Sequence, residues 1–473
     1  MRLRIRGCWA WVLWVISPAA WGDWQAALHA ERIEPALPMS MAGSMSDQVA
    51  RRIHDPIHVR AMVLRDGKTT IALVLCDSCM IERPILDEAK ARMEEETGIA
   101  PDHVIIAATH SHTCPTSAKV FQSVPNEEYQ EQLIERMVTS VATGVLRLEP
   151  ARVGFGVGQC PEEVFNRRWR MKPSADLTNP FGGTDQVRMN PPLGSSDLLE
   201  PAGPTDPAVS VLWVRAADGE PMGAMANYAL HYVGGVPGDE ISADYFGEFS
   251  RLMGERWKPA AARRKPIVFL SNGASGDINN INFRGHEASP EPFGQIRRVA
   301  GRVAERALGA IQESSATLEP RLGSIRRELS LGVRKPTAAE LSKAESLLKE
   351  AEGRPLRTLP EIYAAETQAM SRYPDEVKLW LQAMRVGSVG IVAIPCEVFA
   401  EVGLEIKRKS PFPQTIIIEL ANGYNGYLPT PQQHQWGGYE TWRAKSSYLE
   451  TEASTKMVAT AIELLESLAK DQP

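Results

Sequence analysis

The sequence lacks any excess of positive charge. Among its 473 residues, 52 lysines and arginines stand against 58 aspartates and glutamates, so the formal net charge is −6. A protein that binds nucleic acid needs a basic face to neutralise phosphates, and this composition gives no sign of one. Internal repeats and low-complexity tracts are also missing. We therefore expect an ordinary globular protein that does not bind nucleic acid.

Long apolar runs are missing beyond the N-terminus, so we expect no transmembrane segment in the mature chain. The N-terminus has three arginines among its first six residues, then the apolar stretch 8–16 and small residues up to Gly22. This order is typical of a secretory signal peptide. We predict a signal peptide at residues 1–22, a mature chain at residues 23–473 and a secreted or periplasmic location. An uncleaved N-terminal anchor is the alternative.

Cysteine is scarce, with six residues, and Cys8 lies in the predicted signal peptide. The other five cannot all pair, so at least one thiol is free in the mature chain. Cys76 and Cys79 have the spacing of a redox motif, but they follow a strand pattern without the helical context of a redox site. We interpret them as core or turn cysteines.

Runs rich in valine, isoleucine and leucine alternate with helical patterns along the chain. The predicted strands are 59–64, 70–76, 104–108, 209–214, 222–230, 267–270, 378–386, 391–394 and 415–420. The predicted helices are 84–96, 127–146, 244–257, 293–311, 338–351, 398–407 and 450–468. This alternation predicts an α/β fold, with a mixed β-sheet core flanked by helices in a single large domain.

Two of the nine histidines, His110 and His112, follow the apolar strand 104–108 as a His-x-His pair. Alternate residues of an extended chain point to the same side, so both imidazoles can face one spot beyond the strand end. Such a pair suits a metal ion, or a metal together with a substrate atom. Hydrogen-bonded structural histidines are the alternative.

Four further strand-like segments run into polar residues, which is where open α/β sheets place their ligands. One ends on His231, a second in the glycine- and asparagine-rich loop 273–282, a third on Glu397, and a fourth in the loop that holds Tyr427. Taken singly, a histidine, a first-turn acid or a tyrosine at such places more often serves packing or hydrogen bonding. The residues alone leave both interpretations open.

The order of these motifs resembles the N-terminal catalytic domain of the neutral (non-lysosomal) ceramidase family, over about residues 54–453. The matching phrases are residues 55–67, 108–115, 166–167, 227–231, 241–247, 395–397, 426–430 and 438–440. For example, residues 108–115 look like the family's Thr-His-Thr-His-Ser-Gly-Pro motif, and residues 395–397 look like its Pro-Gly-Glu.

The resemblance implies a single Zn²⁺ held by two histidines, a glutamate and a tyrosine. By position these metal ligands are His110, His231, Glu397 and Tyr427. It also places three residues near the substrate, namely His112, Arg167 and Tyr439. Their implied roles are to hydrogen-bond the scissile carbonyl and to stabilise the negative charge of the tetrahedral intermediate. Two imidazoles and a carboxylate are common for catalytic zinc, and a nearby cation lowers the pKa of a phenol.

Two departures from the family pattern stand out. The family's Gly-Asp-Val-Ser-Pro-Asn loop carries a serine often assigned to the site, and Asn279 takes that position. An amide cannot act as an alkoxide nucleophile, so a covalent acyl-enzyme is excluded there, while attack by metal-activated water remains. Asn279 can still donate a hydrogen bond in the site. The chain also ends after the helical pattern 450–468, so we expect no C-terminal β-sandwich domain.

We therefore expect a secreted zinc-dependent hydrolase that cleaves the amide bond of a small-molecule or lipid N-acyl substrate, with the sphingolipid ceramide as the reference. His112 is our candidate for protonating the leaving amine. One alternative is an esterase or deacetylase that acts on a non-ceramide substrate, for example a sugar-linked one. A second is a non-catalytic ligand-binding homologue, which only Asn279 supports. A third is an amidohydrolase barrel, which would need more histidines at later strand ends. The sequence specifies no oligomeric state.

Overall fold

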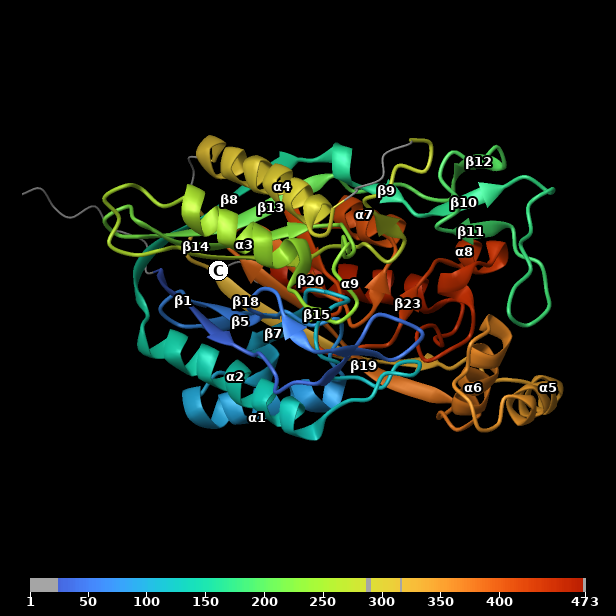
Figure 1. The fold of residues 1–473 in the computed structure, drawn as a ribbon. Helices are drawn as coiled ribbons and strands as arrows, with labels where there is room; N and C mark the ends of the chain where they lie inside the picture. The colour runs from blue at the N-terminus through green and yellow to red at the C-terminus, as the bar shows by residue number, and fades with distance from the viewer. Residues whose placement is uncertain (1–23, 286–290, 315–316, 471–473) are drawn as a thin grey trace, which may run out of the picture.

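The computed structural model describes residues 24–285, 291–314 and 317–470 (Figure 1). The predicted signal peptide lies outside these residues. Two β-sheets form the centre, and helices lie above and below them in the view of Figure 1. Within the described part of the chain, no helix is both long enough and apolar enough to cross a membrane.

The larger sheet has eight strands and is mixed. Its strands are β1 (Gln25–Arg32), β5 (His58–Arg65), β6 (Thr70–Cys76), β7 (Val104–Ala108), β8 (Glu149–Gln159), β13 (Ala208–Ala216), β14 (Pro221–Tyr228) and β16 (Ile267–Asn272). Their order across the sheet is β16-β14-β13-β8-β1-β5-β6-β7. The pairs β6–β7 and β14–β16 are parallel and the other neighbours are antiparallel.

The second sheet has four strands in the order β18-β19-β20-β22. They are β18 (Leu322–Gly332), β19 (Glu376–Val386), β20 (Val389–Ala393) and β22 (Gln414–Ile418), and only β20 and β22 run parallel. The short strands are β2 (Met39–Met41), β3 (Gln48–Ala50), β4 (Arg52–Ile53), β9 (Phe165–Asn166), β10 (Arg168–Met171), β11 (Val187–Met189), β12 (Leu198–Pro201), β15 (Glu240–Ile241), β17 (Ile278–Asn279), β21 (Glu397–Val398) and β23 (Tyr427–Leu428).

Helices cover the outer faces of both sheets. The helices are α1 (Arg83–Thr97), α2 (Glu127–Leu146), α3 (Asp244–Arg256), α4 (Gly294–Glu313), α5 (Ala338–Glu350), α6 (Leu359–Ser371), α7 (Ala400–Lys409), α8 (Pro431–Trp436) and α9 (Ala453–Lys470). Helices α1 and α2 pack on β5, β6 and β7, and α3 and α4 pack on the β13–β16 side of the same sheet. Helices α7 and α9 cover the second sheet, so the molecule has four layers, α/β/β/α.

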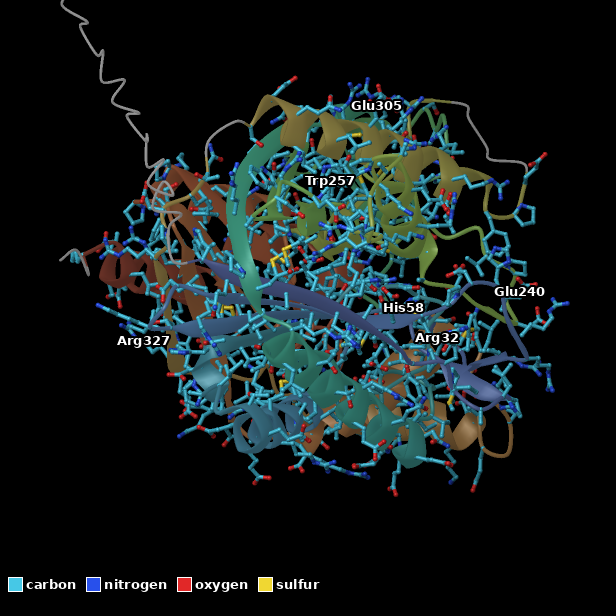
Figure 2. The ribbon with its side chains drawn as sticks, turned by 90° about the vertical axis from the view of Figure 1, so that its left-hand side faces the viewer. Arg32, His58, Glu240, Trp257, Glu305 and Arg327 are labelled. Atoms are coloured by element: carbon cyan, nitrogen blue, oxygen red, sulfur yellow. The ribbon has the colours of Figure 1, made fainter. Side chains whose placement is uncertain are left out.

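The strand sequences explain this layering because both faces of the central strands are apolar. In β5, Ala61 and Val63 face the α1–α2 layer, while Met62 and Leu64 face the second sheet. Side chains alternate along a strand, so a continuous apolar run supplies two buried faces. Many charged groups lie outside, and Figure 2 shows Glu305 and Arg327 at the edge of the molecule.

The predicted α/β fold with a mixed sheet core flanked by helices is confirmed, and the two sheets stay open rather than closing into a barrel over the described residues. The pattern did not predict β1, β8 or β18. Strand β18 carries the charged residues Arg326, Arg327 and Glu328 in succession at partly or fully exposed positions, and β8 is rich in glycine. Such strands are stabilised by their neighbours, so their own sequences carry little strand signal.

Candidate active site

The ends of strands from both sheets meet at one place. The backbone N–H of Ala108, at the end of β7, donates to Leu420 O beyond β22 at 3.2 Å. The N–H of Gly276, beyond β16, donates to Val398 O beyond β20 at 2.7 Å. The carboxyl ends of several strands therefore deliver their loops to a common site, as open α/β sheets do.

Three histidines converge there. His110 Nε2 lies 2.8 Å from His231 Nε2 and 3.1 Å from His112 Nε2. The alternation of side chains along a strand does not explain how the His110 and His112 rings meet. The strand ends at Ala108, and His110 has a left-handed backbone with φ 77°. This conformation is uncommon for a residue with a side chain. The turn at His110 is what brings its ring toward His231.

In two of these rings, the hydrogen bond that Nδ1 donates determines that the lone pair lies on Nε2. His110 Nδ1 donates to Cys79 O at 2.8 Å, and His231 Nδ1 donates to Ser275 O at 3.1 Å. A neutral imidazole that donates from Nδ1 has a lone pair on Nε2. The two Nε2 lone pairs therefore face each other, and an ion between them would remove the repulsion. Burial lowers the pKa of His231, which favours the neutral form that a metal needs.

Glu397 completes this group. Its Oε2 lies 3.3 Å from His110 Nε2 and 3.7 Å from His231 Nε2, yet it is buried without a hydrogen-bond partner. Its other oxygen, Oε1, accepts from the Tyr424 hydroxyl at 3.1 Å. A buried, unpartnered carboxylate oxygen is costly, and a cation would satisfy it. Ligand atoms of His110, His231 and Glu397 all lie within 4.8 Å of one another, so these residues fit a metal ion.

Tyr427 reaches the site through a strand pair. It lies opposite Glu397 in the parallel pair of β21 and β23, and both residues line the same cavity. Arg167 Nη2 donates to the Tyr427 hydroxyl at 3.1 Å. Burial raises the pKa of Tyr427, and Glu397 raises it further, while Arg167 acts in the opposite direction. The phenol is thus protonated unless a metal cation binds its oxygen.

Arg167 is held rigidly. Its Nε donates to Glu440 Oε1 at 2.8 Å, and its Nη2 also donates to Gly276 O at 2.9 Å. The Tyr439 ring, next to Glu440 in the chain, packs edge-on against Tyr427 at 5.7 Å between centroids. These contacts fix the Arg167 guanidinium beside the Tyr427 hydroxyl.

These side chains surround a cavity of about 320 Å³. It is lined by His110, His112, Arg167, Glu397, Tyr427 and Tyr439 among the predicted residues, and by Met45, Met80, Val120, Phe121 and Met189 as its apolar part. His231 stands behind His110 with Nε2 facing it. Asn279 does not line the cavity. Its Nδ2 donates to Asn190 Oδ1 at 2.7 Å, and Asn190 is the residue exposed to the cavity.

Sequence reasoning missed several residues of this site. Tyr424 sits in the same glycine-rich loop as Tyr427, a signal that could have found it. Tyr232 stacks on His112 at 3.7 Å between ring centroids and directly follows His231. Gly43 lies far away in the sequence and has no local signal. A Cβ there would sit 2.4 Å from His112 Cγ, so only glycine leaves room for this ring.

The buried acid Glu419 was also missed, although it supports two of the predicted ligands. Its Oε1 accepts from Ser275 Oγ at 2.6 Å, and its Oε2 accepts from Val398 N at 2.7 Å. Ser275 in turn accepts from His231, and Val398 follows Glu397 in the chain. Burial raises the pKa of Glu419 to about 8. This single side chain ties together the loops that carry a histidine and a carboxylate of the site.

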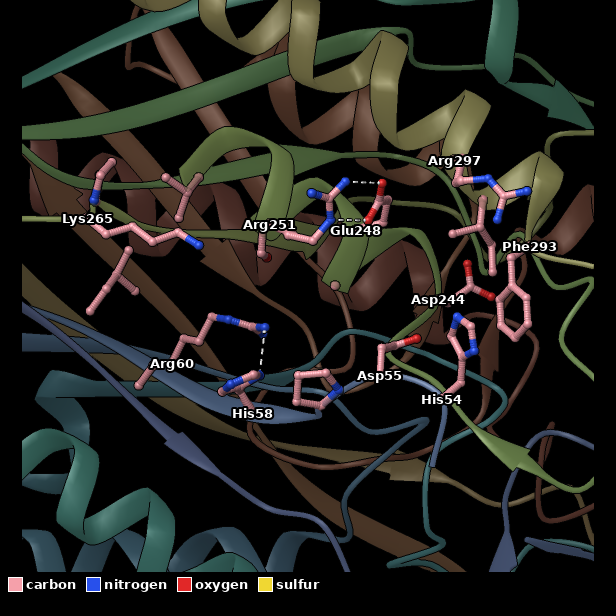
Figure 3. Close-up of a pocket in the computed structure, with 18 residues that line it drawn as sticks. His54, Asp55, His58, Arg60, Asp244, Glu248, Arg251, Lys265, Phe293 and Arg297 are labelled. Carbon is pink, nitrogen blue, oxygen red and sulfur yellow. Dashed lines mark hydrogen bonds and ion pairs between the residues drawn. The ribbon is translucent and has the colours of Figure 1, made fainter. Parts of the chain in front are cut away.

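A larger cavity, of about 530 Å³, lies elsewhere, between β5 and helix α3 (Figure 3). Several of its ionisable groups contact each other: Arg251 forms two hydrogen bonds with Glu248, and Arg60 Nη2 donates to His58 Nδ1 at 3.1 Å. None of the predicted site residues lines it. All five cysteines after Cys8 are buried and free, in agreement with the interpretation of Cys76 and Cys79 as core or turn residues.

Comparison with known proteins gives one family and one fold. The family model described as neutral/alkaline non-lysosomal ceramidase, N-terminal, matches residues 34–288. The crystal structure of neutral ceramidase from Pseudomonas aeruginosa superposes with a TM-score of 0.73 at 19% identity, covering 95% of this chain and 75% of that one. A ceramidase complexed with C2 gives 0.71 at 19% identity, covering 95% and 76%. Since the family model matches more than half of the sequence, this chain belongs to the neutral/alkaline non-lysosomal ceramidase family.

Proposed function

We propose that this protein is a zinc-dependent hydrolase that cleaves the amide bond of an N-acyl substrate, and that His110, His231, Glu397 and Tyr427 hold one Zn²⁺. One observation carries the proposal: two imidazole Nε2 atoms and an unpartnered carboxylate oxygen converge beside a cavity that His110 and Glu397 line. Membership of the ceramidase family supports amides as the substrate class.

The donor set supports zinc as the ion. Two neutral imidazoles, a carboxylate and a phenol oxygen suit a borderline cation that prefers nitrogen and oxygen ligands in a tetrahedral arrangement. When bound, Zn²⁺ supplies a water of lowered pKa and a positive charge for the carbonyl oxygen. Arg167 favours the anionic form of Tyr427 by donating to its oxygen. Cys79 O and Ser275 O keep the two rings in the tautomer that binds a cation.

The remaining cavity residues would act on the substrate. Tyr439 and His112 line the cavity with groups that can donate to the carbonyl oxygen as it becomes negative. Hydrolysis joins a water oxygen to the carbonyl carbon and breaks the carbon–nitrogen bond. We assign the transfer of protons from water to the departing nitrogen to His112 Nε2; with both water protons on that nitrogen, the products are a carboxylate and an ammonium group. Tyr232 fixes the His112 ring by stacking on it.

The site arrangement weakens the case for a binding protein that has lost its activity. That alternative rested on Asn279, which stands outside the cavity and holds Asn190. A serine nucleophile is therefore not what the cavity is built around.

We also propose export, with cleavage after Gly22. N-terminal sequencing of the exported protein tests this, and an intact N-terminus would contradict it.

A substrate library tests the activity. Purified protein should hydrolyse at least one N-acyl amide, and excess chelator followed by Zn²⁺ should abolish and then restore this hydrolysis. Acetylated sugars and carboxylic esters belong in the same library, because turnover of esters alone would replace the amidase assignment with an esterase. Zinc-loaded protein that is inactive on every substrate would reject the proposed function.

A further inference from the structure

One of the phrases that match the family motifs, residues 241–247, contributes nothing to the lining of the active-site cavity. It covers the end of β15 and the first turn of α3. Its residues instead form hydrogen bonds with the two turns that carry His110, His112 and His231. These bonds come from residues 242–245, which we call the linking segment.

Ser242 holds the turn that carries His110 and His112. Its carbonyl oxygen accepts from Ser111 Oγ at 2.8 Å and from Thr113 Oγ1 at 2.9 Å, and its N–H donates to Thr113 O at 3.1 Å. Ser111 lies between the two histidines, and Thr113 directly follows the second. Three hydrogen bonds to one fully buried residue therefore fix this turn.

Asp244 holds the turn that carries His231. Its Oδ1 accepts from Val233 N at 3.0 Å, and its Oδ2 accepts from Gly234 N at 2.8 Å. These two residues follow the histidine by two and three positions. Asp244 is 2% exposed and has a left-handed backbone with φ 54°, which aspartate adopts more readily than most residues with a side chain. Both oxygens of a buried carboxylate therefore hold this turn.

Tyr245 holds the same turn from its other side. Its hydroxyl donates to Leu230 O at 2.8 Å, and Leu230 directly precedes His231. Tyr245 is fully buried, so its ring is fixed by packing. Asp244 and Tyr245 thus fix the chain after and before His231, and Ser242 fixes the other turn from the same short segment. The separation of the two turns is set by this segment.

Asp55 fixes the linking segment itself. Its Oδ2 accepts from Ser242 Oγ at 2.5 Å, and its Oδ1 accepts from Ala243 N at 2.8 Å. Asp55 and Asp244 both line the cavity of Figure 3. These two acids are therefore satisfied by hydrogen bonds that hold the turns of the active site.

We propose that the linking segment positions the histidines of the metal site, and that Asp244 is its principal positioning residue. The inference rests on the proposed zinc-dependent function. A metal is bound tightly only when its ligands are held within about 0.5 Å of the required geometry. The Nε2 atoms of His110 and His231 lie 2.8 Å apart, on the two turns that the segment joins. A shift of either turn changes this separation directly.

Asp244→Asn tests the proposal with little change of shape. Asparagine adopts the same left-handed backbone, but its NH₂ group cannot accept a hydrogen bond, so at least one N–H of the 233–234 turn is lost whichever way the amide points. We expect the dissociation constant for zinc to rise about 10- to 100-fold. At saturating zinc, kcat should fall about tenfold or more while KM changes less than about threefold. Competition with a chromogenic chelator and steady-state kinetics measure these effects.

The matched control is Asp206→Asn. Asp206 is 6% exposed and accepts from Ala208 N and Lys407 Nζ, away from the histidine turns. This variant should keep the zinc affinity and the kcat of the native protein. Native values in Asp244→Asn, or the same loss in both variants, would overturn the inference.

A second pair of variants removes single hydroxyl groups and keeps the test open if Asp244→Asn does not fold. Tyr245→Phe loses the bond to Leu230 O, and we expect the dissociation constant for zinc to rise about three- to tenfold. Tyr228→Phe loses an equivalent buried bond, to Cys160 O, and should bind zinc as the native protein does. Equal zinc affinity in the two variants would count against the linking segment.

Crystal structures of metal-free protein separate this inference from the proposed function. We expect the separation of His110 Nε2 and His231 Nε2 to differ by about 0.5 Å or more between the native protein and Asp244→Asn, or Tyr245→Phe in its place. An unchanged separation rejects the positioning role. Native protein that binds no zinc would reject the proposed function instead, and the comparison of structures would still decide whether the linking segment sets the histidine positions.

Discussion

The active-site cavity and the cavity of Figure 3 differ in a way that volume does not reveal. The cavity of Figure 3 is larger, about 530 Å³ against about 320 Å³, and it has many ionisable side chains. Several of its charges are neutralised by contacts, for example Arg251 with Glu248 and Arg60 with Asp77. At the smaller cavity, His110 and the His231 behind it present nitrogen atoms to each other, and a Glu397 oxygen has no partner. Polar groups left unsatisfied together are a better mark of a site than space is.

Removing a ligand from the smaller cavity should have the largest effect. We expect His231→Ala to lower bound zinc well below one ion per chain and to reduce kcat/KM by at least about 1,000-fold, since the metal supplies both the activated water and the charge on the carbonyl. Elemental analysis and hydrolysis assays measure the two effects. The matched variant His58→Ala, a histidine of the larger cavity, should retain both. Full zinc occupancy in His231→Ala would reject the ligand assignment.

Removing the support behind the ligands should have an intermediate effect. Glu419→Ala frees the loops that carry His231 and Glu397, and we expect the dissociation constant for zinc to rise about 10- to 100-fold. Competition with a chromogenic chelator measures this constant. Glu163→Ala removes an equally buried acid that pairs with Arg302 instead. If both variants bind zinc equally well, Glu419 has no special role in holding the site.

A substitution at position 279, outside the active-site cavity, should have a smaller effect. Asn279→Ser restores the serine that the ceramidase family motif has at this position, but position 279 does not line the active-site cavity. We expect kcat/KM for a simple alkyl amide to change by less than about tenfold, because the hydrogen bond to Asn190 is lost and the cavity gains no reacting group. Steady-state kinetics measures it. A gain of 100-fold would mean that residue 279 reaches the substrate.

The smallest effect belongs to the larger cavity and concerns stability. Burial, and then the Arg60 guanidinium, lower the pKa of His58 from its usual 6.5. The folded protein therefore binds fewer protons than the unfolded chain as the pH falls below about 6.5, and this group contributes less stability there. His58→Asn should remove that loss, which has a slope of at most about 1.4 kcal/mol per pH unit. Urea unfolding at neutral and mildly acidic pH gives the free energy of unfolding of the native protein and of His58→Asn. An identical pH dependence of the two would show that His58 does not titrate this way.

The fold class was predictable because the buried strands are continuous apolar runs, as in β5, β6 and β7. The partners of each strand were not, because the order of strands depends on contacts between distant segments. Strand β1, for example, pairs with β5 and β8, and its own sequence gives little sign of this. The division into two sheets follows from such contacts and not from any local pattern.

The candidate site was predictable where motifs end strands. His110, His231, Glu397 and Tyr427 all follow or begin short strands, and their order matched a known family. Glu419 and Gly43 could not be found this way, since their roles depend on distances to residues far along the chain. Asn279 shows the converse: its motif position suggested a cavity residue, but its side chain turns to Asn190.

Anomalous diffraction at the zinc edge, from crystals of the zinc-loaded protein, tests the central claim most directly. The account predicts one strong peak within about 2.0–2.2 Å of His110 Nε2, His231 Nε2 and an oxygen of Glu397, with the Tyr427 oxygen as a further ligand. A fully occupied zinc ion bound elsewhere, with these side chains unliganded, would contradict it.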